Sequence, residues 1–136
     1  MNKSLIIFLL SICLLPIYDA QCQSQQGESI TTPSGVNITI IENGNGKLPQ
    51  TYDKIKVYYK GCLTNGACFD SLLRGKPFVF KLGKAEVIPG WDEAFRYLSK
   101  GARAKLYIPA HMGYGKRGVS DMIPPNSDLI FEVEVR

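Results

Sequence analysis

Histidine is almost absent from this sequence of 136 residues, where His111 is the only one. No His, Cys, Asp and Glu residues recur at the spacing of metal ligands, and no nucleophile stands with a base in a known motif. A glycine-rich phosphate loop is also missing. If the protein is an enzyme, its chemistry therefore needs neither covalent attack nor a Lewis acid, and we expect no cofactor and no metal site.

Charge of one sign is not concentrated along the chain. Sixteen Lys and Arg residues against twelve Asp and Glu give a formal net charge of +4, and the basic residues are scattered. No basic stripe is interleaved with aromatic residues, so the sequence argues against a nucleic-acid partner.

Long apolar runs are absent except at the N-terminus. Lys3 supplies a positive start, residues 5–15 are mostly apolar, and Pro16 ends the run. This layout is typical of a secretory signal peptide, and the run is short for a membrane span. We expect residues 1–20 to be a signal peptide cleaved after Ala20, with an uncleaved anchor as the alternative. The protein would then be secreted, periplasmic or in the lumen of the secretory pathway.

The rest of the chain predicts a leader and one domain. Residues 21–34 are rich in Gln, Ser and Thr and are expected to form a flexible leader. Residues 35–136 are long enough for a single domain, which we expect to be monomeric.

Hydrophobic periodicity predicts an α+β fold for that domain. Period-two or short apolar runs predict strands at 36–40, 55–63, 68–71, 78–82, 102–109 and 129–135. Trp91, Ala94, Phe95 and Leu98 lie at helical spacing, with Gly101 as a terminator. One helix cannot connect many parallel strands. We therefore predict a curved antiparallel sheet of five to six strands wrapped around one short α-helix.

Two cysteines flank a turn signal inside the domain. If residues 64–66 form a three-residue hairpin loop with a left-handed glycine, Cys62 lies directly opposite Cys68. Opposed Cβ atoms lie about 4.5–5.5 Å apart, so a small adjustment allows a Cys62–Cys68 disulfide in an oxidising compartment. The alternatives are a two-residue turn, which opposes Leu63 to Cys68, and two free thiols. The three-residue loop also places Tyr59 and Phe69 on the other face, as the wall of a pocket.

Seven stretches of the sequence resemble the FKBP family, in order from about residue 36 to the C-terminus. They are VYYKG (57–61), FDS (69–71), KPFVF (76–80), LGKAEVIPGW (82–91), GARAKL (101–106), GYG (113–115) and IPPNSDLIF (123–131). The resemblance implies a peptidyl-prolyl cis/trans isomerase that acts on proline-containing polypeptides. It also implies macrolides such as rapamycin as ligands.

The family resemblance assigns roles to individual residues. Trp91 would form the floor of the pocket, and the backbone N–H of Ile88 would hold a substrate carbonyl. Arg74 resembles a basic residue that orients the Asp70 carboxylate. The catalytic residues implied are Phe69, Asp70, Ile88 and Tyr114. The residues implied in substrate binding are Tyr59, Arg74, Phe78, Glu86, Val87, Trp91, Met122, Ile123 and Phe131.

Two departures from the family pattern lie on the loop that follows Tyr114. Val119 stands where many members carry a histidine, and Met122 replaces a branched aliphatic residue. Both bear on macrolide affinity more than on isomerisation. The alternative function is a non-catalytic proline-segment binding module or chaperone. A thiol–disulfide enzyme is disfavoured, because Cys62 and Cys68 do not have Cys-x-x-Cys spacing.

Overall fold

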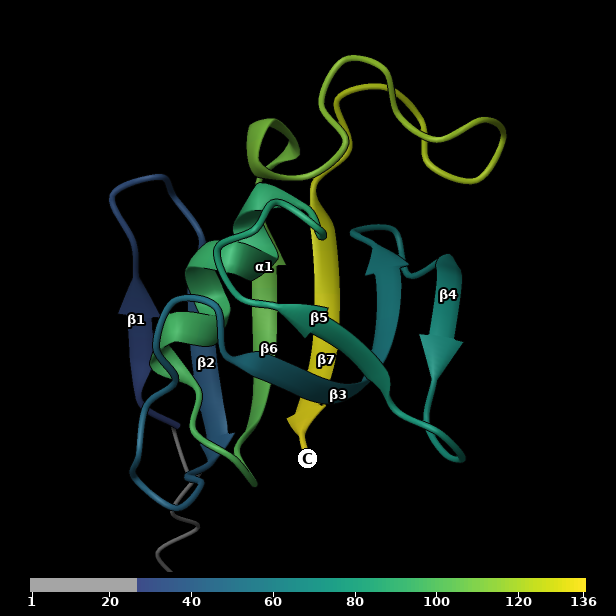
Figure 1. The fold of residues 1–136 in the computed structure, drawn as a ribbon. Coiled ribbons are helices and arrows are strands. Elements are labelled where there is room, and N and C mark those ends of the chain that lie inside the picture. The colour runs from purple at the N-terminus through teal and green to yellow at the C-terminus, as the bar shows by residue number, and fades with distance from the viewer. Residues whose placement is uncertain (1–26) are drawn as a thin grey trace, which may run out of the picture.

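The computed structural model describes residues 27–136, and the predicted signal peptide lies outside them. Within these residues, seven strands, one α-helix and two 3₁₀-helices follow one another (Figure 1). Their order is β1 (Ser29–Thr31), β2 (Asn37–Glu42), β3 (Lys54–Leu63), β4 (Cys68–Leu72), β5 (Phe78–Lys81), α1 (Pro89–Ala94), η1 (Phe95–Tyr97), β6 (Arg103–Ile108), η2 (Ala110–Met112) and β7 (Leu129–Val135). No helix within residues 27–136 is long and apolar enough to cross a membrane.

All strand pairs of the sheet are antiparallel. The strand order is β1-β2-β6-β7-β3-β4, and β5 also pairs with β3. The long strand β3 carries β7 along one side. On its other side it pairs first with β5 and then with β4. The predicted α+β class and curved antiparallel sheet are therefore confirmed.

The sheet begins earlier than the sequence predicted. Ser29–Thr31 forms an edge strand that pairs with β2, although its composition indicated a flexible leader. The polar side chains belong to the pairing, because Asn37 donates to the hydroxyl oxygens of Ser29 and Thr31. Gly35, with φ of 87°, closes the turn between the two strands. The prediction of a flexible leader up to residue 34 is thus wrong for this strand, and residues 21–26 lie outside the described part.

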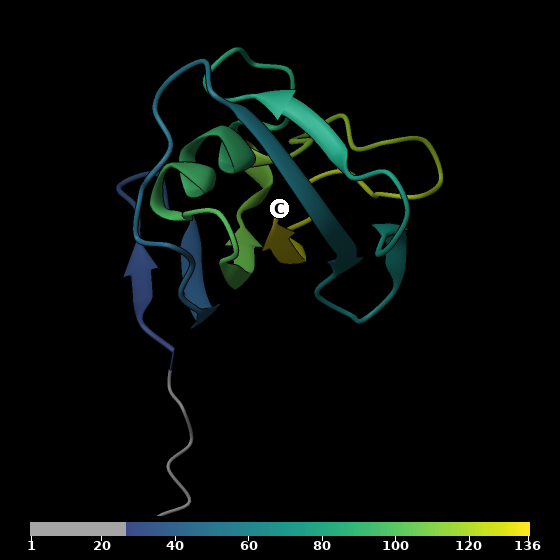
Figure 2. The same cartoon turned by 60° about the horizontal axis from the view of Figure 1, so that its bottom comes forward.

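The short helix α1 lies in the concave face of the sheet (Figure 2). Pro89 occupies its first turn, where a missing N–H costs nothing. The face predicted to be apolar is buried, and Phe95 and Leu98 continue it through η1. Gly90 lies inside the helix. A Cβ there would come within 2.5 Å of the Ile108 side chain, so glycine allows α1 to lie close against β6.

The β3–β4 hairpin has the predicted three-residue loop. The Leu63 N–H donates to the Ala67 carbonyl, Cys62 faces Cys68, and the two cysteines form a disulfide. The register shifts next to this pair, because Gly61 faces Asp70 and leaves Phe69 as an extra residue. Such a bulge bends a strand and redirects its side chains.

The disulfide should stabilise the domain moderately. Replacing Cys62 and Cys68 together by Ala is expected to lower the free energy of unfolding by about 2 kcal/mol, because the loop closed is short. Urea denaturation with and without reductant measures this. Reductant should weaken the wild-type protein by a similar amount and leave the double variant unchanged. An intact mass with both thiols free under non-reducing conditions would contradict the pairing.

Candidate active site

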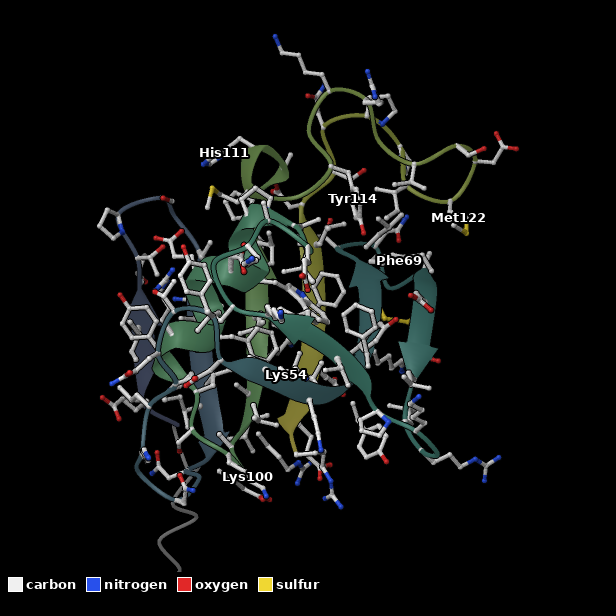
Figure 3. All side chains as sticks on the ribbon, viewed as in Figure 1. Lys54, Phe69, Lys100, His111, Tyr114 and Met122 are labelled. Carbon is white, nitrogen blue, oxygen red and sulfur yellow. A yellow bond between two sulfur atoms is a disulfide. The ribbon has the colours of Figure 1, made fainter. Side chains whose placement is uncertain are left out.

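A pocket of about 230 Å³ opens between the sheet, α1 and the loop that leads from η2 to β7. Figure 3 shows Tyr114 descending from this loop above Phe69. The residues that line the pocket are Tyr59, Phe69, Asp70, Phe78, Glu86, Val87, Ile88, Trp91, Tyr114 and Phe131. Ten of the thirteen residues predicted from the sequence therefore come together here.

Trp91 is the floor of the pocket and part of the core. Its ring is 5% exposed and lies 5.1 Å from Phe95, 5.2 Å from Phe131 and 5.3 Å from Tyr59, measured between centroids. The contacts with Phe131 and Tyr59 are edge-on, and aromatic pairs of this kind each contribute about 0.5–1.5 kcal/mol beyond burial. The indole Nε1 is buried without a hydrogen-bond partner among residues 27–136.

The wall opposite Tyr114 depends on the bulge in β4. In a regular strand, Phe69 and Asp70 would point to opposite faces of the sheet. The extra residue removes that alternation, and both line the pocket. The Phe69 ring lies 5.7 Å from Phe131 and above Gly61. A Cβ at Gly61 would come within 2.6 Å of the Phe131 ring, so only glycine leaves room for both rings.

Polar groups gather at the mouth of the pocket. The Tyr59 hydroxyl donates to the Asp70 carboxylate over 2.7 Å. Burial, followed by this hydrogen bond and the charge of Asp70, raises the pKa of Tyr59 to about 12. Burial and the same carboxylate also raise the pKa of Tyr114. Both phenols are therefore neutral hydrogen-bond donors at neutral pH.

Two carboxylates hold the loop between β5 and α1. The two oxygens of Asp92 accept the N–H groups of Gly83 and Ala85, over 2.8 and 3.0 Å. Glu86 accepts the N–H of Lys81 over 2.8 Å. Sequence reasoning missed Asp92, although an acidic residue in the first turn of a helix was a usable signal.

The Ile88 amide follows that loop directly and lines the pocket. Its N–H donates to no acceptor within residues 27–136, and the Tyr114 hydroxyl likewise has no partner there. Both residues line the pocket, and neither donor is used by the described part of the chain.

A second anchor, also missed by sequence reasoning, holds the loop that carries Tyr114. Asp128 accepts the Tyr107 hydroxyl with one carboxylate oxygen and the Ala110 N–H with the other, over 2.9 Å. The Asn126 N–H closes the loop on the Gly115 carbonyl. No local pattern indicated these contacts, because they join residues far apart in the sequence.

Three predicted binding residues do not line the pocket. Arg74 is exposed beyond β4 and makes no salt bridge within residues 27–136, so the expected pairing with Asp70 is wrong and Tyr59 holds that carboxylate instead. Ile123 is 2% exposed and packs in the core through a bridge with Val119. Met122 is 56% exposed on the loop that carries Tyr114 (Figure 3), and it is not among the residues that line the pocket.

Few kinds of titratable residue line the pocket, and histidine is not among them. His111 contacts the Ser34 carbonyl from η2 and does not line the pocket. In the described part of the chain, no three His, Cys, Asp or Glu residues are grouped so that they could hold a metal ion. The pocket can therefore bury an apolar group and orient a carbonyl with donors.

Known proteins share this architecture. A family model described as FKBP-type peptidyl-prolyl cis-trans isomerase matches residues 45–136. FK506-binding protein 1 of Dictyostelium discoideum is 49% identical over 102 residues, which is 74% of this chain and 95% of the relative. FkpA of Escherichia coli K12, named as an FKBP-type isomerase, is 44% identical over 77% of this chain and 38% of its own length.

Solved structures agree. The crystal structure of a peptidyl-prolyl cis-trans isomerase from Pseudomonas syringae superposes with a TM-score of 0.71 at 33% identity, covering 79% of this chain and 77% of that one. The family match extends over more than half of the sequence and includes every pocket residue. The chain belongs to the family of FKBP-type peptidyl-prolyl cis-trans isomerases.

Proposed function

We propose that the pocket accelerates rotation about X–Pro peptide bonds by desolvation and hydrogen bonding, without a covalent intermediate. The observation that carries this proposal is an apolar pocket, floored by Trp91, with two unused donors at Ile88 and Tyr114. The substrates are proline-containing segments of polypeptides.

The apolar lining acts on the planar amide. Rotation must cross a barrier of about 18–20 kcal/mol, because resonance favours the planar bond. The planar form is also the more polar one, so transfer from water to a pocket of aromatic rings destabilises it relative to the twisted form. Trp91 and Phe131 offer the flat apolar surface that a proline ring requires.

The polar groups act on the twisted amide. Without resonance, the carbonyl carbon loses electron density from nitrogen, and the nearby Asp70 carboxylate favours that state. Tyr59 holds this carboxylate in place. The Ile88 N–H binds a substrate carbonyl and the Tyr114 hydroxyl donates to the rotated geometry. Such contacts accelerate the reaction because they are strongest in the transition state.

The proposal also covers the compartment in which the enzyme works and the macrolides that would inhibit it. The signal-like N-terminus and the Cys62–Cys68 disulfide support work on exported polypeptides in an oxidising compartment. Relatives are named FK506-binding proteins, which supports macrolide binding, rapamycin included, in this pocket. We propose that the enzyme acts as a monomer.

Substitutions at the mouth of the pocket test the assigned roles. Asp70→Ala and Tyr114→Phe should each lower kcat/KM in a proline-peptide isomerisation assay by about tenfold. Each removes one hydrogen bond or one nearby charge from the transition state, and such a loss corresponds to a rate change of about this size. Tyr114→Phe should keep the wild-type unfolding midpoint, whereas Asp70→Ala should lower the free energy of unfolding by about 1 kcal/mol, because it removes the acceptor of the Tyr59 hydroxyl. Arg74→Ala is the matched control and should keep full activity. A wild-type rate equal to the uncatalysed one, with binding of a proline peptide retained, would instead indicate a non-catalytic binding module.

The pH profile tests the absence of proton transfer. We expect kcat/KM to be flat from about pH 6 to pH 9, because no histidine or thiol lines the pocket and both tyrosines titrate above their usual range. The raised pKa of Tyr59 also stabilises the fold below pH 10, and that contribution is lost as the pH rises toward 12. Stopped-flow assays across this range, and unfolding of Tyr59→Phe in alkali, measure both effects. A bell-shaped profile centred near neutrality would contradict the mechanism.

A further inference from the structure

A second cavity, of about 290 Å³, lies away from the isomerase pocket and shares no lining residue with it. It runs between the loop before β3, the start of β3, the turn after η1 and the end of β7. Figure 3 shows Lys54 and Lys100 on this side of the molecule, far from Tyr114. We call this cavity the basic groove, and its charged lining residues are Lys47, Asp53, Lys54, Lys56, Lys100 and Arg136.

The basic groove holds all of the excess charge of the chain. Five cationic side chains and one carboxylate line it, which is a formal side-chain charge of +4, and Glu134 pairs with one of these cations, Arg136. The whole sequence also has a formal charge of +4, so the remaining residues carry eleven charges of each sign. Five basic residues that are scattered along the sequence are therefore gathered by the fold into one concave surface. A concave surface of one sign raises the local concentration of oppositely charged ligands.

Folding leaves four of these five cations without a salt bridge within residues 27–136. Arg136 pairs with Glu134, but none of the four lysines makes a salt bridge within residues 27–136. Asp53 accepts the Gln50 N–H and so caps its own turn. Lys54 also lies directly opposite Lys81 across the β3–β5 pair. Like charges in that position destabilise a sheet, so the arrangement is not explained by stability.

We propose that the basic groove binds an acidic segment of a polypeptide. Its lining includes Leu48, which is 51% exposed, and Pro49, and it includes no aromatic residue. Apolar side chains beside lysines suit a peptide that carries Asp or Glu among apolar residues, whereas single-stranded nucleic acid would require stacking surfaces. A flat membrane surface would not enter a hollow. The choice of a polypeptide rests on the proposed function, since polypeptides are its substrates.

Fluorescence anisotropy with a labelled, proline-free peptide of Glu, Ser and Leu tests this inference. The wild-type protein should bind it, and the affinity should fall as salt rises, because the contacts are between exposed charges. Lys54→Glu combined with Lys100→Glu should weaken binding by about tenfold or more. Lys76→Glu combined with Lys84→Glu changes the total charge equally outside the groove and should leave the affinity within about twofold of wild type. Exchange of Glu for Gln in the peptide should abolish binding.

Two further measurements separate the possible failures. The groove variant should keep wild-type kcat/KM on a short uncharged proline peptide, and its unfolding midpoint should not fall, because Lys54→Glu relieves the repulsion from Lys81. Equal affinity for the Glu and Gln peptides, with isomerase activity intact, would overturn the groove alone. Groove-dependent binding of heparin, or of phosphatidylserine vesicles, without binding of the acidic peptide would overturn it in favour of another polyanion. If the wild-type protein shows no isomerase activity, the proposed function is overturned instead.

Discussion

The packing of Trp91 connects the stability of this domain to its site. The ring belongs to α1, contacts Phe95 beneath it and reaches Tyr59 and Phe131 on the sheet. The same contacts that bury the helix in the concave face therefore build the floor of the pocket. The indole N–H has no hydrogen-bond partner among residues 27–136, and burial of such a group costs about 1–3 kcal/mol.

Around that floor, the polar groups are held by backbone anchors rather than by one another alone. Asp92 and Asp128 fix the two loops that bring Ile88 and Tyr114 to the pocket. The disulfide closes the hairpin beside the bulge at Phe69. Preorganised donors need no reorientation during the reaction, which is what acceleration of a simple bond rotation requires.

Hydrophobic periodicity and turn residues predicted most of this architecture. They did not predict the features that depend on contacts between residues far apart in the sequence. The helical spacing of Trp91, Ala94 and Phe95 was sufficient to predict α1, and the glycine at residue 66 was sufficient to predict the hairpin loop, because both signals are local. The edge strand β1 was missed because polar residues are ordinary on an edge. The position of Arg74, the role of Asp128 and the basic groove depend on residues brought together from different elements, which no local pattern encodes.

Trp91 is the floor of the pocket that we propose both binds and isomerises X–Pro bonds. Exchange NMR of a short proline peptide with a substoichiometric amount of protein measures both events together, because Trp91 is the only tryptophan and gives a single indole N–H signal. We expect exchange cross-peaks between cis and trans peptide that rapamycin abolishes, together with a shift of the indole signal when the peptide is added. Catalysed exchange with an unmoved indole signal would contradict the proposal.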